Sequence, residues 1–372
     1  MTFCIISHVL HTEKDNIFFA YSPYVNEMNI WLKYVDNVII VAPKSDFKLN
    51  PIHASYQQDH IHFVEAKKFS TLSFLGILEA LAAVPSNCWY IFKAMRKADH
   101  IHLRCPGNIG LLGCIVQIGF PKKKKSAKYA GNWDPKSKQP LSYRLQKWIL
   151  NNPFLTKNMQ VLVYGEWENQ SKNILPFFTA TYSESEKMEV QPRALEKPIQ
   201  FIFVGSFTKG KQPLYAIQLI KKIKENGTNV CLFLIGEGTE RNALETFIKE
   251  NNLESIVTIK GNQTREDIKN FYQNSHFLLL PSKSEGWPKV VAEAMFWGCV
   301  PIATKVSCIP TMLDNGNRGI LLSENSHQDA KQIVQLCNNQ KEYNSKANLA
   351  MNWSCNYTLD LFESEIKKII QV

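Results

Sequence analysis

The sequence predicts an α/β protein with two domains, each built on a doubly wound parallel sheet. Short apolar runs rich in β-branched and aromatic residues alternate with helical segments along the chain. Strands that are buried on both faces and separated by helices are typical of parallel sheets. The alternation stops in a polar segment, residues 183–198, and then resumes. A length of 372 residues also favours two domains.

The first predicted domain covers residues 1–184. Its expected strands lie at residues 3–7, 38–41, 61–64, 100–103, 126–130, 160–164 and 178–182. Helices are expected between several of them, for example at residues 23–33 and 74–97. Residues 72–84 form an apolar stretch interrupted by Glu79. This stretch is interpreted as a helix packed on the sheet, with an interfacial membrane helix as the alternative.

The second predicted domain covers residues 199–355. Its expected strands lie at residues 199–205, 230–235, 257–260, 277–280 and 300–303. Residues 183–198 are polar and contain two prolines, so they are the expected interdomain linker.

The composition is that of a soluble globular protein, with 45% hydrophobic and 20% charged residues. The nine cysteines are scattered without a Cys-x-x-Cys pair, which favours a reducing cytosol over a disulfide framework or a zinc site. No uncharged apolar stretch reaches 18 residues, so no membrane span is expected. Residues 1–11 resemble a first strand rather than a signal peptide, and a cytoplasmic location is expected.

The net charge of +10 is concentrated in residues 120–160, which contain ten Lys and Arg residues and a single acid, Asp134. Four of these are consecutive, from Lys122 to Lys125. The alternatives are a solvated loop and a patch for the anionic inner leaflet of the plasma membrane. Nucleic acid is not an expected partner, because no nucleic-acid-binding module accompanies the patch.

Residues 281–302 predict a ligand site made of a strand, a glycine turn, a helix and a strand. Glu285 stands at the turn, and Glu293 follows eight positions later in the second turn of the helix. Pro288 suits the first helical position, and the free N–H groups beyond it attract an anion. Two carboxylates beside a phosphate can accept hydrogen bonds from sugar hydroxyls. The pattern therefore indicates a sugar nucleotide, the alternative being a solvated helix with two surface glutamates.

This segment resembles the Glu-seven-Glu element of retaining glycosyltransferases of family 4. The resemblance extends to FIFVGSFTKG at residues 201–210, VCLFLIGEG at 230–238 and the strand ending at Gly261. These elements occur in the family's order and cover about residues 200–325. The resemblance implies the GT-B fold, in which two Rossmann-like domains face a central cleft. It also implies that a C-terminal helix at residues 356–372 packs back on the first domain.

On the donor side, the resemblance implies that Lys211 contacts the donor diphosphate. Ser206 stands where the family commonly has an arginine, and Lys209 either compensates for it or is solvated. Glu285 is expected at the donor sugar and Glu293 at the ribose hydroxyls. The other expected donor-binding residues are Gly205, Gly236, Gly261, Asn262, Gly286, Trp287 and Pro288. For Trp287, bounding the sugar pocket and capping the core both remain open.

The acceptor side is harder to predict, because the glycine-rich loop frequent in the family is absent after the first strand. The candidates there are Tyr24, Glu27, Arg104, Asn108 and Asn132. Many family members have a catalytically important histidine in the loop that here contains Asn132 and Asp134. Asp134 is therefore a candidate catalytic group, or else the partner of a nearby lysine.

The implied function is retaining transfer of a hexose from a nucleotide sugar to a hydroxyl of a growing glycan. A surface polysaccharide, a capsule, a lipopolysaccharide or a lipid-linked oligosaccharide would be the product. The expected catalytic residues are Glu285, Lys211 and Asp134. No Asp-x-Asp motif occurs, so no obligatory metal or other cofactor is expected. The alternatives are a sugar-nucleotide epimerase of similar fold and a binding subunit that has lost turnover.

Overall fold

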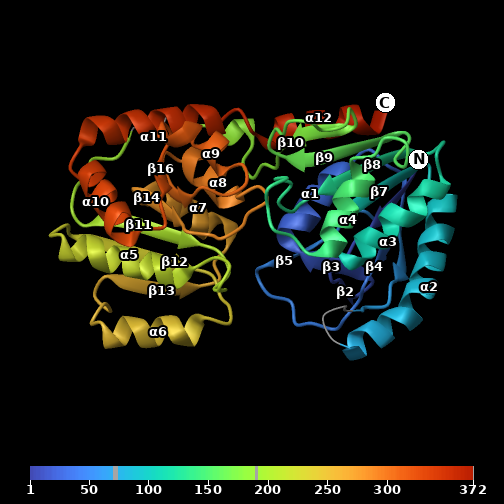
Figure 1. The fold of residues 1–372 in the computed structure, drawn as a ribbon, viewed down its shortest axis with the longest axis horizontal. Helices are drawn as coiled ribbons and strands as arrows, with labels where there is room; N and C mark the ends of the chain where they lie inside the picture. Colours follow the sequence, from blue (N-terminus) through green and yellow to red (C-terminus); the bar gives the residue numbers. More distant parts are fainter. Residues whose placement is uncertain (70–73, 189–191, 372) are drawn as a thin grey trace. The chain divides into compact units, whose positions relative to one another are not determined.

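A computed structural model describes residues 1–69, 74–188 and 192–371 of the chain (Figure 1). The chain divides into two compact units. Unit 1 consists of Met1–Phe178 and Glu363–Val372, and unit 2 of Thr179–Phe362. The chain thus returns to unit 1 within its last helix, α12 (Leu359–Gln371), where Glu363 accepts hydrogen bonds from Lys33 at 2.7 Å and Tyr34 at 2.8 Å.

Unit 1 is built on a seven-stranded parallel sheet with the order β10-β9-β8-β7-β1-β4-β6. Its strands are β1 (Thr2–Ile6), β4 (Asn37–Ala42), β6 (Ile61–Glu65), β7 (His100–Cys105), β8 (Lys124–Tyr129), β9 (Met159–Tyr164) and β10 (Ile174–Phe177). Its helices are α1 (Ser22–Leu32), α2 (Phe74–Lys97), α3 (Asn108–Val116), the short η1 (Gln117–Gly119) and α4 (Leu141–Leu150). Alternate residues of β1 face opposite sides: Phe3 packs near Trp31 of α1, whereas Cys4 joins the core under α2 and α3.

Two features of unit 1 differ from the prediction. A strand at residues 178–182 is wrong: the last strand is β10, and Tyr182 instead packs on Phe296 and Trp297, with ring centroids 5.0 and 5.1 Å away. A small antiparallel sheet of β2 (Thr12–Lys14), β3 (Ile17–Tyr21) and β5 (His53–Ser55) was not predicted. Asp15 and Asn16, both at positive φ, form the two-residue turn between β2 and β3.

Unit 2 is built on a six-stranded parallel sheet with the order β13-β12-β11-β14-β15-β16. Its strands are β11 (Ile199–Val204), β12 (Val230–Ile235), β13 (Val257–Gly261), β14 (Phe277–Leu280), β15 (Val300–Thr304) and β16 (Ile320–Leu322). Its helices are α5 (Pro213–Glu225), α6 (Arg241–Glu250), α7 (Arg265–Asn274), α8 (Lys289–Phe296), α9 (Ile309–Met312), α10 (Ser326–Cys337) and α11 (Gln340–Ser354), with η2 (Glu184–Glu186) and η3 (Asp314–Gly316). The five strands predicted here are confirmed, and β16 was not foreseen.

Both faces of the unit 2 sheet are covered, as β11 shows. Phe201 and Phe203 point into a core shared with α5 and α10, whereas Ile202 and Val204 point into a second core with α8. The strand order runs outward in both directions from β11 and β14, so the sheet has a topological switch point between these two strands.

The segment predicted as a linker is part of unit 2. Residues 189–191 lie outside the described part, but Arg193 fixes the end of the segment to the helices of unit 2. Its guanidinium donates to four carbonyl oxygens near the ends of α7 and α8, at 2.6–3.0 Å, those of Tyr272, Gln273, Trp297 and Gly298. A cation suits this place because helix carbonyl ends carry partial negative charge.

In the described residues, no helix is both long enough and apolar enough to cross a membrane. The stretch at residues 72–84 belongs mostly to α2. Residues 72–73 lie outside the described part of the chain, as do the side chains of residues 74–81.

Candidate active site

The loops that follow β11 and β14 meet at the switch point of unit 2. Three contacts join them. Lys283 N–H donates to the carbonyl of Gly210 at 2.8 Å, and the Gln212 amide donates to the carbonyl of Pro281 at 2.6 Å. The third contact is an ion pair in which Lys211 Nζ lies 2.6 Å from Glu285 Oε1. Open parallel sheets bind ligands at this kind of position, beyond the carboxyl ends of the strands.

The ion pair has one deeply placed member and one accessible member. The Glu285 side chain is 7% exposed and the Lys211 side chain is 30% exposed. An ammonium group has three N–H donors, and one of them serves Glu285. Lys211 is therefore held in place by a buried carboxylate while its outer side can still meet an anion.

Two glycines let the loop after β12 pass directly beneath the loop after β11. A Cβ on Gly236 would lie 1.9 Å from the carbonyl oxygen of Gly205, and one on Gly238 would lie 2.4 Å from that of Phe207. The Phe207 side chain is fully buried and anchors its loop. Gly236, a predicted donor-binding residue, thus has a packing reason for being glycine. Gly261 adopts φ +70° at the end of β13, a conformation that favours glycine.

Three predicted donor-side residues are exposed around these loops: Ser206, Lys209 and Asn262. Within the described part of the chain their side chains make no hydrogen bond or ion pair. Lys209 is two positions from Lys211, on the same loop. These side chains are therefore available to a ligand without breaking an existing contact.

Helix α8 begins one residue later than predicted, at Lys289, and Pro288 is its N-cap. No side chain caps the helix, but the N–H groups of Lys289 and Val291 donate to the carbonyls of Trp287 and Pro288, both at 2.9 Å. The helix terminus therefore offers an anion mainly its partial positive charge. The carbonyl of Gly286 accepts from Ser307 Oγ at 3.1 Å, which fixes the turn before the helix. Of the two interpretations of Trp287, the contacts favour packing, since its ring centroid lies 6.1 Å from that of Trp353 and 5.6 Å from that of Tyr357.

Glu293 lies in the second turn of α8, as predicted, but its carboxylate is engaged. Oε1 accepts from Thr181 Oγ1 at 2.6 Å and Oε2 accepts from the Tyr272 hydroxyl at 3.1 Å. Burial, helped by the Glu293 charge, raises the pKa of Tyr272 well above its ordinary value, so this hydroxyl stays a donor. Glu293 also lines a cavity of about 10 Å³, roughly the size of one water molecule. The carboxylate thus accepts from two hydroxyl groups of the protein, and its predicted contact with a ribose stays a prediction.

In unit 1 the predicted acceptor residues divide into two sets. Tyr24 and Glu27 on α1 come together with Arg104 on β7. Arg104 donates to Glu27 Oε1 at 2.8 Å, with side chains 11% and 3% exposed, and its guanidinium lies 5.4 Å from the Tyr24 ring centroid. This buried ion pair joins a helix to the sheet.

Asn108 and Asn132 make local contacts instead. Asn108 donates to the carbonyl of Phe69 at 3.1 Å, and Asn132 Oδ1 accepts from the backbone of Asp134 at 2.9 Å. Asp134 Oδ1 in turn accepts from the backbone of Lys136 at 2.8 Å. The carboxylate therefore stabilises a turn. The nearby Lys147 Nζ donates to the main-chain oxygens of Trp133 and Asp134, at 2.7 and 3.1 Å.

One residue that the prediction passed over lies at the same sheet edge. His8 follows β1, is exposed, and packs against Gly107, where a Cβ would come 2.5 Å from its ring. β1 and β8 flank β7 in the sheet, so His8 shares this edge with Arg104 and Asn132. Its position directly after the first apolar strand was the available signal.

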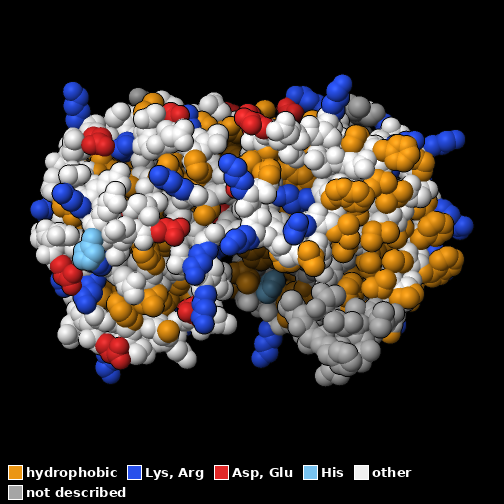
Figure 2. Space-filling view, in the orientation of Figure 1, with side chains coloured by type: hydrophobic (Ala, Val, Ile, Leu, Met, Phe, Trp, Pro, Cys, Tyr) orange, Lys and Arg blue, Asp and Glu red, His pale blue; other side chains and the backbone are white. Residues whose placement is uncertain are grey.

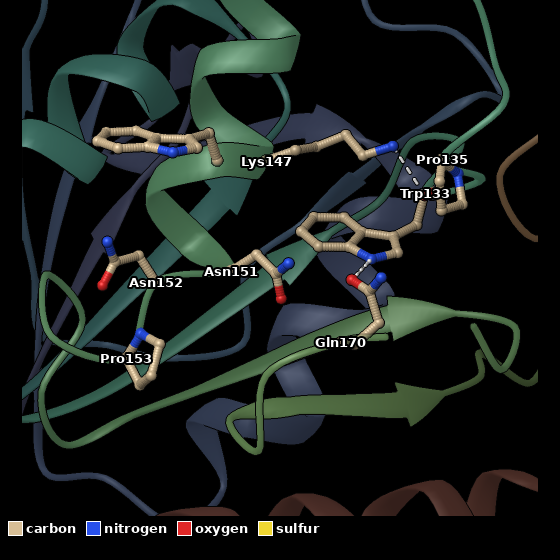
Figure 3. Close-up of a pocket in the computed structure, with 8 residues that line it drawn as sticks. Trp133, Pro135, Lys147, Asn151, Asn152, Pro153 and Gln170 are labelled. Atoms are coloured by element: carbon tan, nitrogen blue, oxygen red, sulfur yellow. Dashed lines mark hydrogen bonds between the residues drawn. The ribbon is translucent and has the colours of Figure 1, made fainter. Parts of the chain in front are cut away.

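A pocket of about 420 Å³ opens beside the turn that holds Asp134 (Figure 3). Its walls are indole, proline and amide side chains together with one lysine: Trp133, Pro135, Lys147, Trp148, Asn151, Asn152, Pro153 and Gln170. The Trp133 indole donates to Gln170 at 2.9 Å. Across the described ranges, no three His, Cys, Asp or Glu side chains gather as metal ligands would.

The sequence pattern of the glycosyl transferases group 1 family matches residues 184–353. This segment holds Lys211, Glu285 and Glu293. The match covers somewhat less than half of the chain. Of the predicted site, the donor side thus lies within the family match and the acceptor side lies outside it.

Two curated relatives are each similar to part of the chain. An uncharacterized glycosyltransferase of Methanocaldococcus jannaschii is 33% identical over 141 residues, which are 38% of this chain and 38% of the relative. The amylovoran biosynthesis glycosyltransferase AmsK of Erwinia amylovora is 30% identical over 158 residues, 41% of this chain and 39% of the relative. Each similarity therefore spans about two fifths of either protein.

The whole chain resembles solved structures at low sequence identity. The crystal structure of Anabaena Alr3699/HepE in complex with UDP and glucose superposes with a TM-score of 0.69 at 13% identity, covering 100% of this chain and 99% of that one. Such a likeness shows the fold. The chain has the GT-B fold, with two Rossmann-like α/β units, as predicted.

Proposed function

We propose that this chain is a retaining glycosyltransferase that moves a hexose from a nucleotide sugar to a hydroxyl of a growing glycan. The observation that carries the proposal is the Lys211–Glu285 ion pair at the switch point of unit 2, inside the segment that matches the glycosyl transferases group 1 family. A cation and a carboxylate side by side suit a ligand in which a diphosphate is joined to a sugar.

The donor diphosphate would lie against Lys211, Lys209 and the first turn of α8. The two lysines supply full positive charges, and the helix terminus adds a partial positive charge. Ser206 can donate one hydrogen bond but supplies no charge. Glu285 would accept hydrogen bonds from the donor sugar, and Glu293 would exchange the Thr181 hydroxyl for those of the ribose.

In the transfer step, the bond from the anomeric carbon to the diphosphate oxygen breaks and a bond to the acceptor oxygen forms on the same face. Negative charge develops on the leaving diphosphate, where Lys211 and the helix terminus stabilise it. The acceptor proton passes to the departing diphosphate oxygen. Glu285 forms no covalent bond in this scheme, and no obligatory metal is proposed.

The names of similar proteins support the class of substrate and product. One relative is named for amylovoran biosynthesis, and a protein of the same fold was solved with UDP and glucose. The proposed product is accordingly a surface polysaccharide, a lipopolysaccharide or a lipid-linked oligosaccharide. The proposed location is the inner face of the plasma membrane.

A labelling experiment tests this function against its alternatives. The purified chain is incubated with membranes of the source organism and a panel of radiolabelled UDP-, GDP-, ADP- and CMP-sugars. A transferase places label in lipid or polysaccharide, and Glu285→Gln abolishes the incorporation. An epimerase converts the nucleotide sugar without an acceptor. A subunit without turnover leaves both pools unchanged, and that result would refute the proposal.

A further inference from the structure

Unit 1 exposes a broad apolar surface (Figure 2). It is separate from the predicted donor and acceptor residues. This surface, the apolar face, consists of large side chains on α2, η1, α3, α4 and the loop after α4. Its members are Trp89, Phe92, Ile115, Ile118, Leu141, Leu145, Trp148 and Phe154. Leu141 is 78% exposed, Phe154 75%, Trp148 61% and Trp89 54%. Exposure of this extent costs stability in water unless something covers the surface.

The apolar face is continuous rather than a scatter of single residues. Helix α3 packs against both α2 and α4, so their outer surfaces adjoin. Trp89 and Phe92 of α2 have ring centroids 6.0 Å apart, and Phe92 lies 5.3 Å from Phe120, the residue that follows η1. In unit 2 the large exposed hydrophobic side chains among the described residues are Met188, Leu349 and Leu361, from a loop and two different helices. Contiguous apolar patches mark interaction sites, whereas isolated residues do not.

Cationic side chains accompany the apolar face. Exposed basic residues on the same elements and the adjoining loops are Lys93, Arg96, Lys97, Lys122, Arg144 and Lys157. None of these six forms an ion pair within the described part of the chain. Two of them lie over the exposed rings: Lys93 Nζ is 4.9 Å from the Trp89 ring centroid, and Lys157 Nζ is 5.0 Å from that of Phe154.

Acids do not offset this charge. Asp99 and Asp134 are the only acidic residues in the sequence between residues 89 and 160. Asp99 accepts from the backbone of Thr2 at 2.7 Å, and Asp134 from that of Lys136 at 2.8 Å. The segment that carries the apolar face, residues 89–160, is therefore predominantly basic.

The consecutive lysines themselves contribute less to this field than their number suggests. Lys123 donates to the main-chain oxygens of Arg96 and Ala98, and Lys125 donates to Gln117 Oε1 at 2.8 Å. Burial lowers the pKa of Lys125 to about 8. The expectation of a solvated lysine loop is wrong for these two residues, and β8 begins at Lys124. The surface charge comes mainly from the helices.

The geometry points to an anionic lipid bilayer as the partner of the apolar face. Tryptophan, phenylalanine and leucine insert at the boundary between headgroups and acyl chains, and lysine and arginine beside them meet anionic headgroups. Each such cation strengthens the attraction to a charged leaflet. A second copy of the chain would instead bring cations against cations around a twofold axis. This inference rests on unit 1 and is independent of the proposed sugar transfer.

Vesicle co-sedimentation of the full chain tests the inference. The vesicles contain either phosphatidylcholine alone or phosphatidylcholine with phosphatidylglycerol, at low and high salt. We expect binding to the anionic vesicles, at least about tenfold weaker binding to the neutral ones, and weakening by salt. The double variant Trp148→Ser/Phe154→Ser and the double variant Lys93→Glu/Lys157→Glu should each weaken binding about tenfold or more. The matched controls in unit 2, Leu349→Ser and Lys331→Glu, should bind as the wild type does.

Three outcomes would overturn the inference. They are no binding to anionic vesicles, equal binding to both vesicle types, and wild-type binding by both apolar-face variants. Light scattering identifies a covering second copy if it shows a dimer that the Trp148→Ser/Phe154→Ser variant loses. Thermal denaturation with nucleotide sugars distinguishes the two proposals. A bound donor should raise the melting temperature of the apolar-face variants as much as that of the wild type. A chain that binds vesicles but no donor would refute only the sugar transfer.

Discussion

The donor side in unit 2 and the predicted acceptor side in unit 1 differ in how their polar residues are used. In unit 2, Lys211 and Glu285 meet at the ends of two adjacent strands while Ser206, Lys209 and Asn262 stay open to a ligand. In unit 1, Glu27 and Arg104 satisfy each other in a buried pair, and Asp134 stabilises a turn. Both regions lie at carboxyl edges of parallel sheets. The difference shows that a position at the carboxyl edge of a parallel sheet is not enough to make a binding site. The two regions differ in whether polar side chains remain free to contact a ligand.

The largest effect is expected from Lys211→Gln. Turnover in the labelling assay should fall about 10²- to 10³-fold, because a donor that stabilises developing negative charge has about this effect in enzymes. The control Lys209→Gln changes a neighbouring exposed lysine that forms no ion pair with the described residues, and it should have a smaller effect. Equal losses in the two variants would show that the pairing with Glu285 has no special importance.

Glu27→Gln should destabilise unit 1 without changing donor binding. Loss of one member of a buried ion pair leaves an uncompensated charge and costs about 3–5 kcal/mol. Urea unfolding measures this loss. The control is Glu13→Gln, whose partner Lys44 lies at 2.6 Å but whose pair is about one third exposed, so that it should cost less than about 1 kcal/mol. If Glu27→Gln weakened donor binding while keeping its stability, the two regions would be alike after all.

Arg193→Met should destabilise unit 2 by about 2–4 kcal/mol, because hydrogen bonds from a charged donor to buried carbonyls contribute strongly. Lys221→Met removes a cation from an exposed position on α5 and serves as the control. Urea unfolding measures the free energy of unfolding of both variants. A loss for Arg193→Met no larger than the loss for the control would mean that the segment around Arg193 is not held to α7 and α8 by this residue.

The smallest effect is expected from Thr181→Val. One hydrogen bond to Glu293 is lost, at a cost of about 1 kcal/mol. Donor affinity should be kept or should rise, since the hydroxyl that a ribose would replace is gone. Calorimetric titration measures the affinity, and Thr239→Val in an exposed loop is the control. A fall in affinity for Thr181→Val alone would assign Thr181 to the donor site itself.

The fold was largely predictable because its signals are local. The apolar runs at 199–205 and 230–235 mark β11 and β12, and Gly298, which adopts φ +68°, ends α8 where expected. The hairpin of β2 and β3 was missed because its turn is Asp-Asn rather than a glycine-containing pair. The strand expected at 178–182 failed because the apolar residue Tyr182 packs on α8 and its neighbours rather than in a sheet.

The site was predictable only where function and local sequence coincide. The loops of Lys211 and Glu285 could be placed from the sequence, but the ion pair between these two residues and the partners of Glu293 could not be foreseen. Thr181 and Tyr272 lie 112 and 21 residues away in sequence, and no periodicity links them to α8. The burial of Lys125 was equally hidden, because this residue ends a run of four lysines just before the strand predicted at 126–130.

Calorimetric titration of the wild type, Lys211→Gln and Asp134→Asn with UDP, GDP, ADP and CMP sugars tests the central claim most directly. The claim predicts that the wild type binds one nucleotide class, that Lys211→Gln binds it at least about tenfold more weakly, and that Asp134→Asn binds it normally. Binding that survives in Lys211→Gln, or that is lost in Asp134→Asn, would contradict the placement of the donor at the Lys211–Glu285 pair.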